Sequence, residues 1–275
     1  MFFKVNENPR TSIREIKSNL ELPYYQIQRV LKEEKMKPFK IHITYTLRLR
    51  DSLRRLQFCH WLAEQDDNFL GNVIWTDECS FTNLGLFNRH NEHYWARENP
   101  HINYEARPQH RFGINIWVGL WRDRVVGPFI FNETLNAERY LNFLNTNVLN
   151  YLEDVPLIQL RDIWWQQDGA PAHNERRVVN RLNEIFPNHW IGTNGPVSWP
   201  ARSPDLNPLD FFLWGYVKNS VYKNHYNNVE ELRIAVLRAL HGIPRRTIQR
   251  VLINGVKKRC RLCIAEDGNI FEHRL

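Results

Sequence analysis

The sequence predicts an α/β protein, in which a mixed sheet flanked by helices follows a small all-α region. From Gly71 onward, short apolar segments rich in β-forming residues alternate with amphipathic helical segments. The clearest strand covers residues 163–165, inside the stretch D-I-W-W-Q-Q-D-G-A-P-A-H, where a glycine and a proline stop the apolar run. Residues 11–35, by contrast, carry helical periodicity. Alternation of the two element types is what indicates a sheet covered by helices.

Composition is that of one large domain, or of one domain with a small appendage. The chain has 275 residues, of which 43% are hydrophobic, with 10 Trp and 15 Phe, so material for a packed core is ample. No apolar run approaches the roughly 18 residues of a membrane span. The N-terminal stretch M-F-F-K-V-N-E-N-P lacks the apolar region of a signal peptide. We therefore expect a soluble intracellular protein with no membrane partner.

Positive charge is concentrated in the first quarter of the chain. The formal net charge is +7, and residues 1–62 hold 13 Lys and Arg against 6 Asp and Glu. The rest of the chain is balanced, with 24 basic and 24 acidic residues. This asymmetry is expected of a nucleic-acid-binding arm on a near-neutral body, or of a basic solvated face without a partner.

The four cysteines do not predict a disulfide framework. Cys59 and Cys79 are isolated, and Cys260 and Cys263 form a lone C-x-x-C with no second pair at zinc-finger spacing. We expect ordinary reduced thiols.

The first 45 residues predict a partial helix-turn-helix followed by a basic linker. Ser12 and Glu15 have capping-box spacing, and Pro23 is placed to be the first residue of a second helix. Two short helices joined by a tight turn form the core of a helix-turn-helix, although a generic helical hairpin has the same pattern. The side chains expected to contact DNA bases or phosphates are Tyr25, Gln28, Arg29 and Lys32 on the second helix, Lys37 and Lys40 in the linker at 36–46, and Arg48 and Arg54 beyond it.

Residues 47–65 predict a single linker helix. Leu49, Leu53, Leu56 and Trp61 are among its expected apolar positions. Its arginines at 48, 50, 54 and 55 could contact phosphates or could form a solvated face.

The body of the chain carries an Asp at or near the end of two predicted strands and another at the start of a helix. Asp77 is near the end of a strand at 72–77, and Asp168 takes the last position of the strand that begins at residue 163. Asn207 can cap a helix that places Asp210 in its first turn. The other predicted elements are strands at 93–95, 112–120 and 125–131, helices at 136–152, 175–186, 229–240 and 247–259, and an extended end at 268–273.

Three carboxylates in one place repel one another. Two unit charges about 4 Å apart cost roughly 4 kcal/mol at an effective dielectric constant of about 20. Divalent Mg²⁺ or Mn²⁺ removes this repulsion, and a pair of such ions can activate water and stabilise the leaving oxygen of a phosphodiester. The alternative for Asp168 is that it caps the turn that follows it. Together with the basic arm, the three acids favour metal-dependent cutting or joining of nucleic acid.

Three motifs, in this order, resemble those of the Tc1/mariner transposases. They are W-T-D-E-C-S-F at 75–81, Q-D-G-A-P-A-H at 167–173 and S-P-D-L-N-P-L-D-F-F-L-W-G at 203–215. The resemblance implies an RNase H-like core that cuts and pastes DNA at transposon ends, acting in the nucleus as a dimer on double-stranded DNA. It implies a metal and catalytic triad of Asp77, Asp168 and Asp210, served by two Mg²⁺ or Mn²⁺ ions. His173 belongs to the second motif and could support the site from outside the metal shell, or could bond the loop structurally.

The sequence departs from the family pattern in two respects. Between Asp168 and Asp210 lie 41 residues, more than is typical of the family, and the excess falls in the connector at 191–201. The family normally carries a second, upstream helix-turn-helix, so we expect an N-terminal truncation that affects recognition of transposon ends more than chemistry. Asp205 is interpreted as a turn residue, and Glu78 should point to the face of its strand opposite Asp77.

The predicted organisation has four parts: 1–45, a partial helix-turn-helix and linker; 46–70, a linker helix; 71–225, the catalytic domain; and 226–275, a C-terminal helical extension. Two other functions remain open. A DNA-binding protein derived from a transposase would have lost cleavage, and an RNase H-like nuclease acting on RNA or hybrids would leave the helix-turn-helix unexplained.

Overall fold

The computed structural model describes residues 11, 13–36, 46–83, 111–131 and 133–275, and it divides the chain into two compact units, Met1–Thr44 and Tyr45–Leu275. The predicted strand at 93–95, the capping residue Ser12, and the predicted DNA contacts Lys37 and Lys40 lie outside the described residues. The four-part organisation expected from the sequence stays a prediction.

The smaller unit contains two helices, as predicted. Helix α2 (Ile13–Leu20) and helix α3 (Tyr24–Glu33) meet through the buried side chains of Ile16 and Ile27. Glu21 has a φ of 51°, in the left-handed region, which ends α2 and turns the chain. Pro23 stands immediately before α3 rather than as its first residue, and its φ of −61° is suited to that entry.

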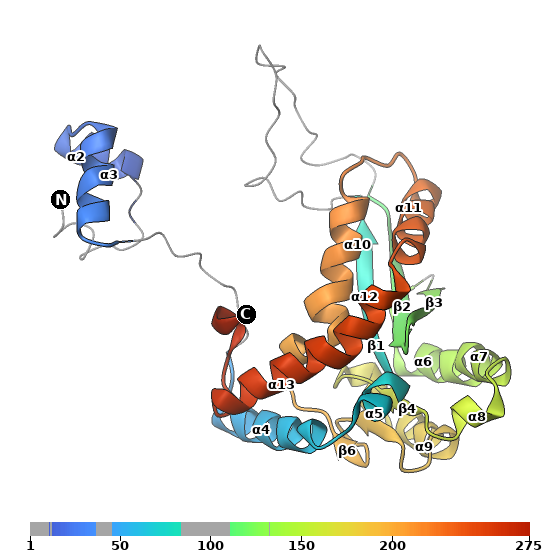
Figure 1. Cartoon of the computed structure of the whole chain (residues 1–275). Helices are drawn as coiled ribbons and strands as arrows, with labels where there is room; N and C mark the ends of the chain where they lie inside the picture. The colour runs from blue at the N-terminus through green and yellow to red at the C-terminus, as the bar shows by residue number, and fades with distance from the viewer. Residues whose placement is uncertain (1–10, 12, 37–45, 84–110, 132) are drawn as a thin grey trace. The chain divides into compact units, whose positions relative to one another are not determined.

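The larger unit is built on a six-stranded mixed sheet with the strand order β3-β2-β1-β4-β5-β6 (Figure 1). Strands β1, β2 and β3 form an antiparallel meander, and β4, β5 and β6 continue the sheet in parallel from the other side of β1. The strands are β1 (Val73–Thr82), β2 (Gly113–Trp121), β3 (Arg124–Phe131), β4 (Trp164–Gln166), β5 (Trp190–Gly192) and β6 (Val197–Ser198). The predicted mixed sheet is confirmed, and the strands predicted at 112–120 and 125–131 correspond to the antiparallel pair β2 and β3.

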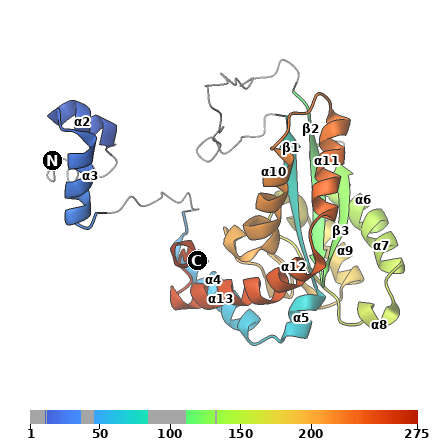
Figure 2. The same ribbon diagram turned by 45° about the horizontal axis from the view of Figure 1, so that its top comes forward.

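Helices cover both faces of this sheet (Figure 2). On one face, α6, α7 and α9 enclose a core with Ile74, Trp117 and Trp165, whereas α4, α10, α11 and α13 enclose the other core. The helices are α4 (Leu49–Ala63), α5 (Asp67–Asn72), α6 (Ala137–Phe143), α7 (Leu149–Glu153), α8 (Leu157–Leu160), α9 (Arg176–Ile185), α10 (Trp214–Val221), α11 (Val229–His241), α12 (Arg245–Arg250) and α13 (Val256–Ala265). Among the described helices, none combines the length and apolar character that crossing a membrane requires.

Several helices are joined end to end by π-helical turns. Leu144–Val148 links α6 to α7, Leu209–Leu213 leads into α10, and Val251–Gly255 links α12 to α13. Continuous helical patterns in the sequence therefore correspond to composite helices. Three short 3₁₀ turns, Pro171–Asn174, Pro204–Leu206 and Glu272–Arg274, complete the described elements, and the last replaces the extended end expected at 268–273.

The inner face of α4 differs from the predicted one. Leu53 is 57% exposed, whereas Asp51 and Arg55 are only 2% and 1% exposed. Phe58 and Leu62 supply the apolar contacts. The apolar pattern predicts the wrong buried face because two charged residues of α4 face the core. Partners from distant segments neutralise their charges there.

Two acids also sit differently from expectation within their strands. Asp77 lies in the middle of β1, because antiparallel pairing with β2 carries β1 on as far as Thr82. Asp168 lies two residues beyond the end of β4 rather than at its last position. Parallel pairing between β1 and β4 stops at Trp75 and Gln166, so both acids follow the point where these two strands part.

Candidate active site

Asp77 faces the side of the sheet on which α10 packs. Odd-numbered residues of β1, such as Val73 and Trp75, belong to the core beneath that helix. The indole Nε1 of Trp214 donates a hydrogen bond of 2.6 Å to Oδ2 of Asp77. Trp214 is a core residue, at 6% exposed, but its polar edge also orients this carboxylate.

Asp168 is held by the turn that follows β4. Its Oδ1 accepts a hydrogen bond of 3.0 Å from the backbone N–H of Ala170, so it does cap the turn. The same oxygen lies 2.8 Å from Nδ1 of His173, which is buried. Glu78 lies on the opposite face of β1 from Asp77, as strand alternation predicts, and its Oε1 is 3.3 Å from Nε2 of His173. That distance suits an ion pair, although the two groups are not aligned for a hydrogen bond.

The charges of Asp168 and Glu78 favour the protonated, imidazolium form of His173, which lies between the two carboxylates. Burial lowers the pKa of His173, but the negative charges of Glu78 and Asp168 outweigh burial and raise it to about 10. Burial likewise raises the pKa of Asp168, but the hydrogen bond and charge of His173 leave that pKa lowered overall. Asp168 is therefore ionised and oriented at neutral pH.

Asp210 lies in the first helical turn leading into α10, as predicted. Oδ1 of Asn207 accepts a hydrogen bond of 3.1 Å from the N–H of Leu209, which caps that turn. The Asp210 side chain is exposed to solvent, yet nearby protein atoms and the charge of Asp168 raise its pKa to about 7. Lys218, two turns further along α10, acts in the opposite sense and lowers it.

The structure brings the three predicted acids into one electrostatic cluster. Burial, followed by the charge of Asp210, raises the pKa of Asp77 well above its ordinary value, and the charge of Asp168 adds to the effect. The hydrogen bond from Trp214 opposes this shift. Repulsion between the carboxylates, which the sequence predicted, is thus present, and it disfavours having all three ionised without a cation.

The donor set suits a hard divalent cation, although it is not closed around one. Within the described ranges, no three His, Cys, Asp or Glu side chains are arranged so that they could hold a metal ion as they stand. Trp214 contacts one carboxylate oxygen of Asp77, and His173 contacts one carboxylate oxygen of Asp168. The second oxygen of each acid is left for a ligand. Asp210 is exposed and has room to turn. Carboxylate oxygens with unrelieved repulsion are the donors that Mg²⁺ and Mn²⁺ prefer.

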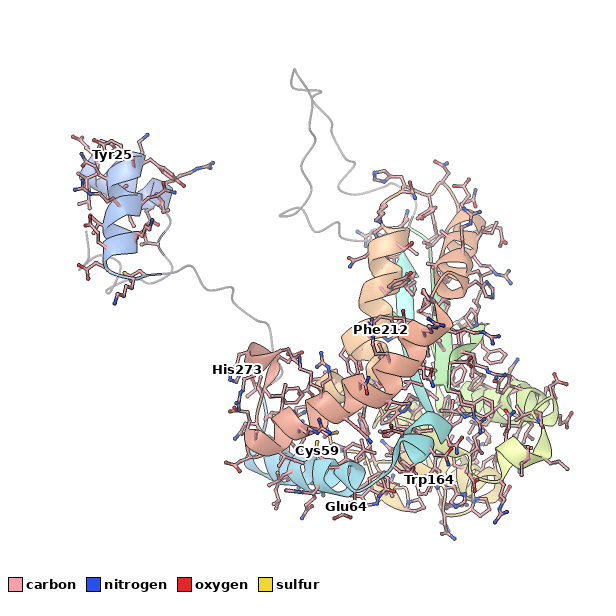
Figure 3. The ribbon with its side chains drawn as sticks, viewed as in Figure 1. Tyr25, Cys59, Glu64, Trp164, Phe212 and His273 are labelled. Atoms are coloured by element: carbon pink, nitrogen blue, oxygen red, sulfur yellow. The ribbon has the colours of Figure 1, made fainter. Side chains whose placement is uncertain are left out.

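Four of the predicted DNA contacts lie together on helix α3. Tyr25 is 64% exposed and projects from the helix (Figure 3), and Gln28, Arg29 and Lys32 are also exposed. Arg29 is 3.4 Å from Glu33 in a surface ion pair that solvent weakens. In the larger unit, Arg48 and Arg54 are exposed at the start and on the outer side of α4. Their contact with DNA stays a prediction.

Arg55, by contrast, is neither a phosphate contact nor part of a solvated face. Its guanidinium is buried and forms two hydrogen bonds, of 2.6 and 2.5 Å, with the carboxylate of Asp205. It also donates to the backbone oxygen of Gly268 and to the hydroxyl of Ser203. Asp205 does lie in a turn, as predicted, and in addition anchors this turn to α4. Local sequence gave no signal for the pair, because its members are 150 residues apart.

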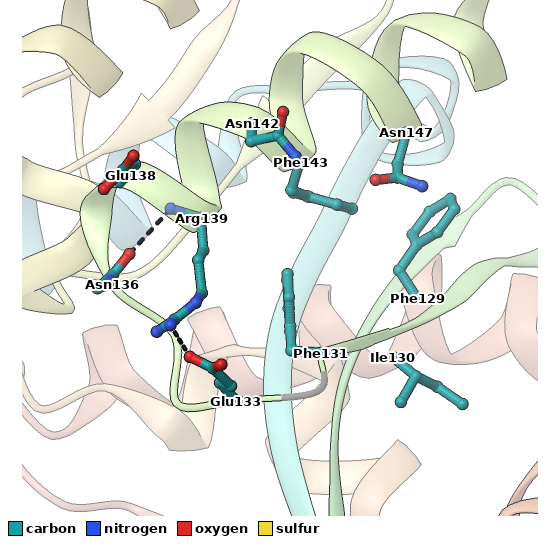
Figure 4. Close-up of a pocket in the computed structure, with 10 residues that line it drawn as sticks. All are labelled: Phe129, Ile130, Phe131, Glu133, Asn136, Glu138, Arg139, Asn142, Phe143 and Asn147. Atoms are coloured by element: carbon teal, nitrogen blue, oxygen red, sulfur yellow. Dashed lines mark hydrogen bonds and ion pairs between the residues drawn. The ribbon is translucent and has the colours of Figure 1, made fainter.

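A pocket of about 620 Å³ lies apart from the acidic cluster, between the edge strand β3 and helix α6 (Figure 4). The side chains of Arg139 and Glu133 in its wall form an ion pair with each other. The charges of Arg139 and Glu133 therefore compensate one another, and Glu138 is a further acid in the lining. The lining residues are Phe129, Ile130, Phe131, Glu133, Asn136, Glu138, Arg139, Asn142, Phe143 and Asn147.

The fold and the site together define a class: a protein with an RNase H-like core whose acids lie on the central strand, after the neighbouring parallel strand, and at the start of a helix. No protein-family model matches the chain. The Tc3 transposase of Caenorhabditis elegans is 27% identical over 221 residues, which cover 79% of this chain and 62% of that protein. The Tc1 transposase of the same organism is 25% identical over 203 residues, or 71% of this chain and 68% of that protein.

Solved structures agree with this assignment of the fold. A pre-cleavage transpososome of Mos1 matches with a TM-score of 0.77 and 20% identity, over 98% of this chain and 78% of that one. The catalytic domain of Mos1 mariner transposase matches with a TM-score of 0.64 and 21% identity, over 84% and 100% of the two chains. The chain is similar to the Tc1/mariner transposases, as its three motifs predicted, and it spans less than two thirds of the length of the Tc3 protein.

Proposed function

We propose that this chain is a divalent-metal-dependent DNA endonuclease and strand transferase that cuts at transposon ends and joins them to target DNA. The observation that carries the proposal is the electrostatic cluster of Asp77, Asp168 and Asp210, on three segments that the fold brings together. Relatives support it. Structures of Mos1 include a paired-end complex with a transposon end, a strand-transfer complex, and complexes with Mg or Mn.

In this proposal, Asp77, Asp168 and Asp210 hold two Mg²⁺ or Mn²⁺ ions. When bound, such ions supply activation of water and stabilisation of the leaving oxygen of a phosphodiester. The protein's own contribution is orientation. Trp214 fixes the Asp77 carboxylate and His173 fixes that of Asp168, and both contacts restrict the carboxylates before substrate arrives.

The partner in this proposal is double-stranded DNA, bound by two copies of the chain that pair two ends. The exposed face of α3 supports DNA binding, since Tyr25, Gln28, Arg29 and Lys32 are of types that contact bases and phosphates. The paired-end complexes of Mos1 support a dimer on DNA. Work on chromosomal DNA would place the protein in the nucleus.

The test is cleavage of a labelled duplex that carries the inverted repeats flanking the gene, with Mg²⁺, with Mn²⁺ and with chelator. We expect metal-dependent cuts at the repeat boundary. Asp168→Asn, which keeps the size of the side chain and removes its charge, should abolish them. The matched control is Asp162→Asn, an exposed acid just before β4, which should leave cleavage intact.

The outcomes separate the three functions that the sequence left open. Binding without cutting, by the wild type, would indicate a transposase-derived DNA-binding protein. Cleavage confined to RNA or hybrid duplexes would indicate a nuclease of the RNase H type. Metal-dependent DNA cutting that survives Asp168→Asn would contradict the assignment of the site.

A further inference from the structure

Strand β1 loses its parallel neighbour just before Asp77. The ladder between β1 and β4 ends with Trp75 opposite Gln166. Thr76 is the next residue of β1, and the backbone N–H and C=O of a strand residue point to the same side. Both groups of Thr76 therefore point toward β4, and the ladder with β4 goes no further.

Two side chains bond the backbone of Thr76 where the ladder ends. Oε1 of Gln166 accepts a hydrogen bond of 3.1 Å from the N–H of Thr76, and the Thr76 hydroxyl donates one of 2.6 Å to the backbone oxygen of Gln166. Nδ2 of Asn207 donates a hydrogen bond of 3.3 Å to the backbone oxygen of Thr76. Oδ1 of Asn207 meanwhile caps the helical turn that contains Asp210. Thr76, Gln166 and Asn207 are thus joined in one network.

The network is closed off from water. Thr76, Gln166 and Asn207 are 1%, 0% and 2% exposed. Nε2 of Gln166 has no hydrogen-bond partner among the described residues, and an unpaired buried donor is destabilising. Leucine or methionine would avoid this unpaired donor but would also remove the side-chain acceptor of the buried Thr76 N–H.

Each member of the network is close in sequence to one acid of the cluster. Thr76 immediately precedes Asp77, Gln166 precedes Asp168 by two residues, and Asn207 precedes Asp210 by three. The hydrogen bonds therefore join the three backbone segments that carry the acids, at the place where the sheet itself no longer joins them.

We propose that Thr76, Gln166 and Asn207 form a positioning clamp that sets the separation of the three acidic segments and thereby the affinity of the site for divalent ions. None of the three touches the ions; they act through the backbone of Asp77, Asp168 and Asp210. The inference rests on the proposed function, since it presupposes that these acids hold metal.

The test is a titration with Mn²⁺ alone, followed by electron paramagnetic resonance, in which free Mn²⁺ gives a six-line signal that binding diminishes. Asn207→Ala removes the bond to Thr76 and the cap near Asp210. Loss of groups that orient metal ligands typically weakens metal binding about 10- to 100-fold, and we expect a dissociation constant raised to that extent. Ser203→Ala is the matched control, because its hydroxyl is equally buried in the same loop but bonds Arg55 and Ala201.

A second pair of variants covers the case in which Asn207→Ala does not fold. Thr76→Val has nearly the same shape as the wild type and lacks the hydroxyl that bonds Gln166, whereas Thr76→Ser retains it. We expect Thr76→Val to weaken Mn²⁺ binding several-fold and Thr76→Ser to restore it. Circular dichroism melts establish that every variant is folded at the temperature of the titration.

Failure of this inference is distinguishable from failure of the proposed function. Wild-type protein that binds Mn²⁺, together with Asn207→Ala and Thr76→Val variants that bind it equally well, would overturn the clamp and leave the proposed function standing. Weakening by Ser203→Ala to the same degree would overturn it too, because general loosening of the loop would then be sufficient. Wild-type protein that does not bind Mn²⁺ would overturn both.

Discussion

Two clusters of charged residues in the larger unit differ in how their charges are balanced. Around Arg55, one buried guanidinium meets the Asp205 carboxylate and three further acceptors, so that positive and negative charges are matched. Around Asp77, burial and the charges of Asp210 and Asp168 raise the pKa of Asp77, and burial and the charge of Asp168 raise that of Asp210. The cations Lys218 and His173 lower the pKa of Asp210 and of Asp168 respectively. The first cluster connects α4, the turn Pro204–Leu206 and the C-terminal segment. The second cluster has an excess of negative charge at the point where β1 and β4 stop pairing.

The difference teaches how a fold separates stability from chemistry. A matched buried pair is destabilising to break, because the remaining charge has no water to solvate it. An unmatched cluster is destabilising to keep, and a protein retains it when a ligand of opposite charge is to bind there. Only a loop of four residues separates Asp205 from Asp210, and the two acids nonetheless belong to opposite designs. Perturbing each cluster in turn should therefore have effects of opposite sign.

The largest expected effect comes from breaking the matched cluster. Arg55→Ala leaves the Asp205 carboxylate nearly buried without its counter-charge, and it leaves the Gly268 carbonyl without its donor. We expect a loss of about 3–5 kcal/mol in the free energy of unfolding. Urea denaturation followed by circular dichroism measures it.

Arg54→Ala is the control for that experiment, because Arg54 is an exposed neighbour on the same helix. Its effect should stay within about 0.5 kcal/mol, as is usual for surface positions. An equal loss in the two variants would show that arginine at 55 contributes through α4 in general and not through Asp205.

Much of the fold could be predicted from periodicity, because apolar alternation and helix caps are local signals. The strands around Trp117 and Trp165 and the helices α9 and α11 follow directly from them. Strand ends were less accurate, since they depend on pairing. β1 continues past Asp77 because β2 supplies partners, and β4 is short because only three of its residues face β1 in register.

The candidate site divides along the same line. Motif spacing located Asp77, Asp168 and Asp210, and strand alternation placed Glu78 on the opposite face. His173, which orients Asp168, was a candidate from its motif. Trp214 was missed as a group that orients Asp77, because it resembles a core residue, and Gln166 resembles a strand residue until the fold places it beside Thr76. Arg55 was misinterpreted for the same reason: a basic residue on a helix is ordinarily solvated, and its partner is 150 residues away.

A smaller effect should come from a second matched pair, which Asp51 forms with Arg202. Burial raises the pKa of Asp51, but the backbone N–H of Arg48 and the guanidinium of Arg202 outweigh burial and leave it lowered. A carboxylate whose folded pKa lies below its unfolded one stabilises the fold above the unfolded pKa, near 3.8. That contribution disappears as pH falls through the folded pKa. Asp51→Asn should cost about 1 kcal/mol at pH 7 and progressively less towards pH 3.

Urea denaturation at a series of pH values between 7 and 3 measures this difference. Glu64→Gln, at an exposed position just beyond α4, is the control and should match the wild type throughout. A difference between Asp51→Asn and wild type that stays constant down to pH 3 would mean that the Asp51 carboxylate contributes by packing rather than by charge.

The smallest expected change is the one whose sign is most informative. Asp210→Asn removes one of the repelling charges from the unmatched cluster. In chelator at pH 8, we expect its free energy of unfolding to equal that of the wild type or to exceed it by up to about 1 kcal/mol, as for other exposed charge interactions.

Thermal melts with and without Mn²⁺ sharpen the comparison. Saturating Mn²⁺ should stabilise the wild type more than the variant, because an ion that binds the folded state shifts unfolding by mass action. The order of the two stabilities therefore reverses on adding metal. A large loss for Asp210→Asn in chelator would instead mean that Asp210 has a structural partner, and that the two clusters share one design after all.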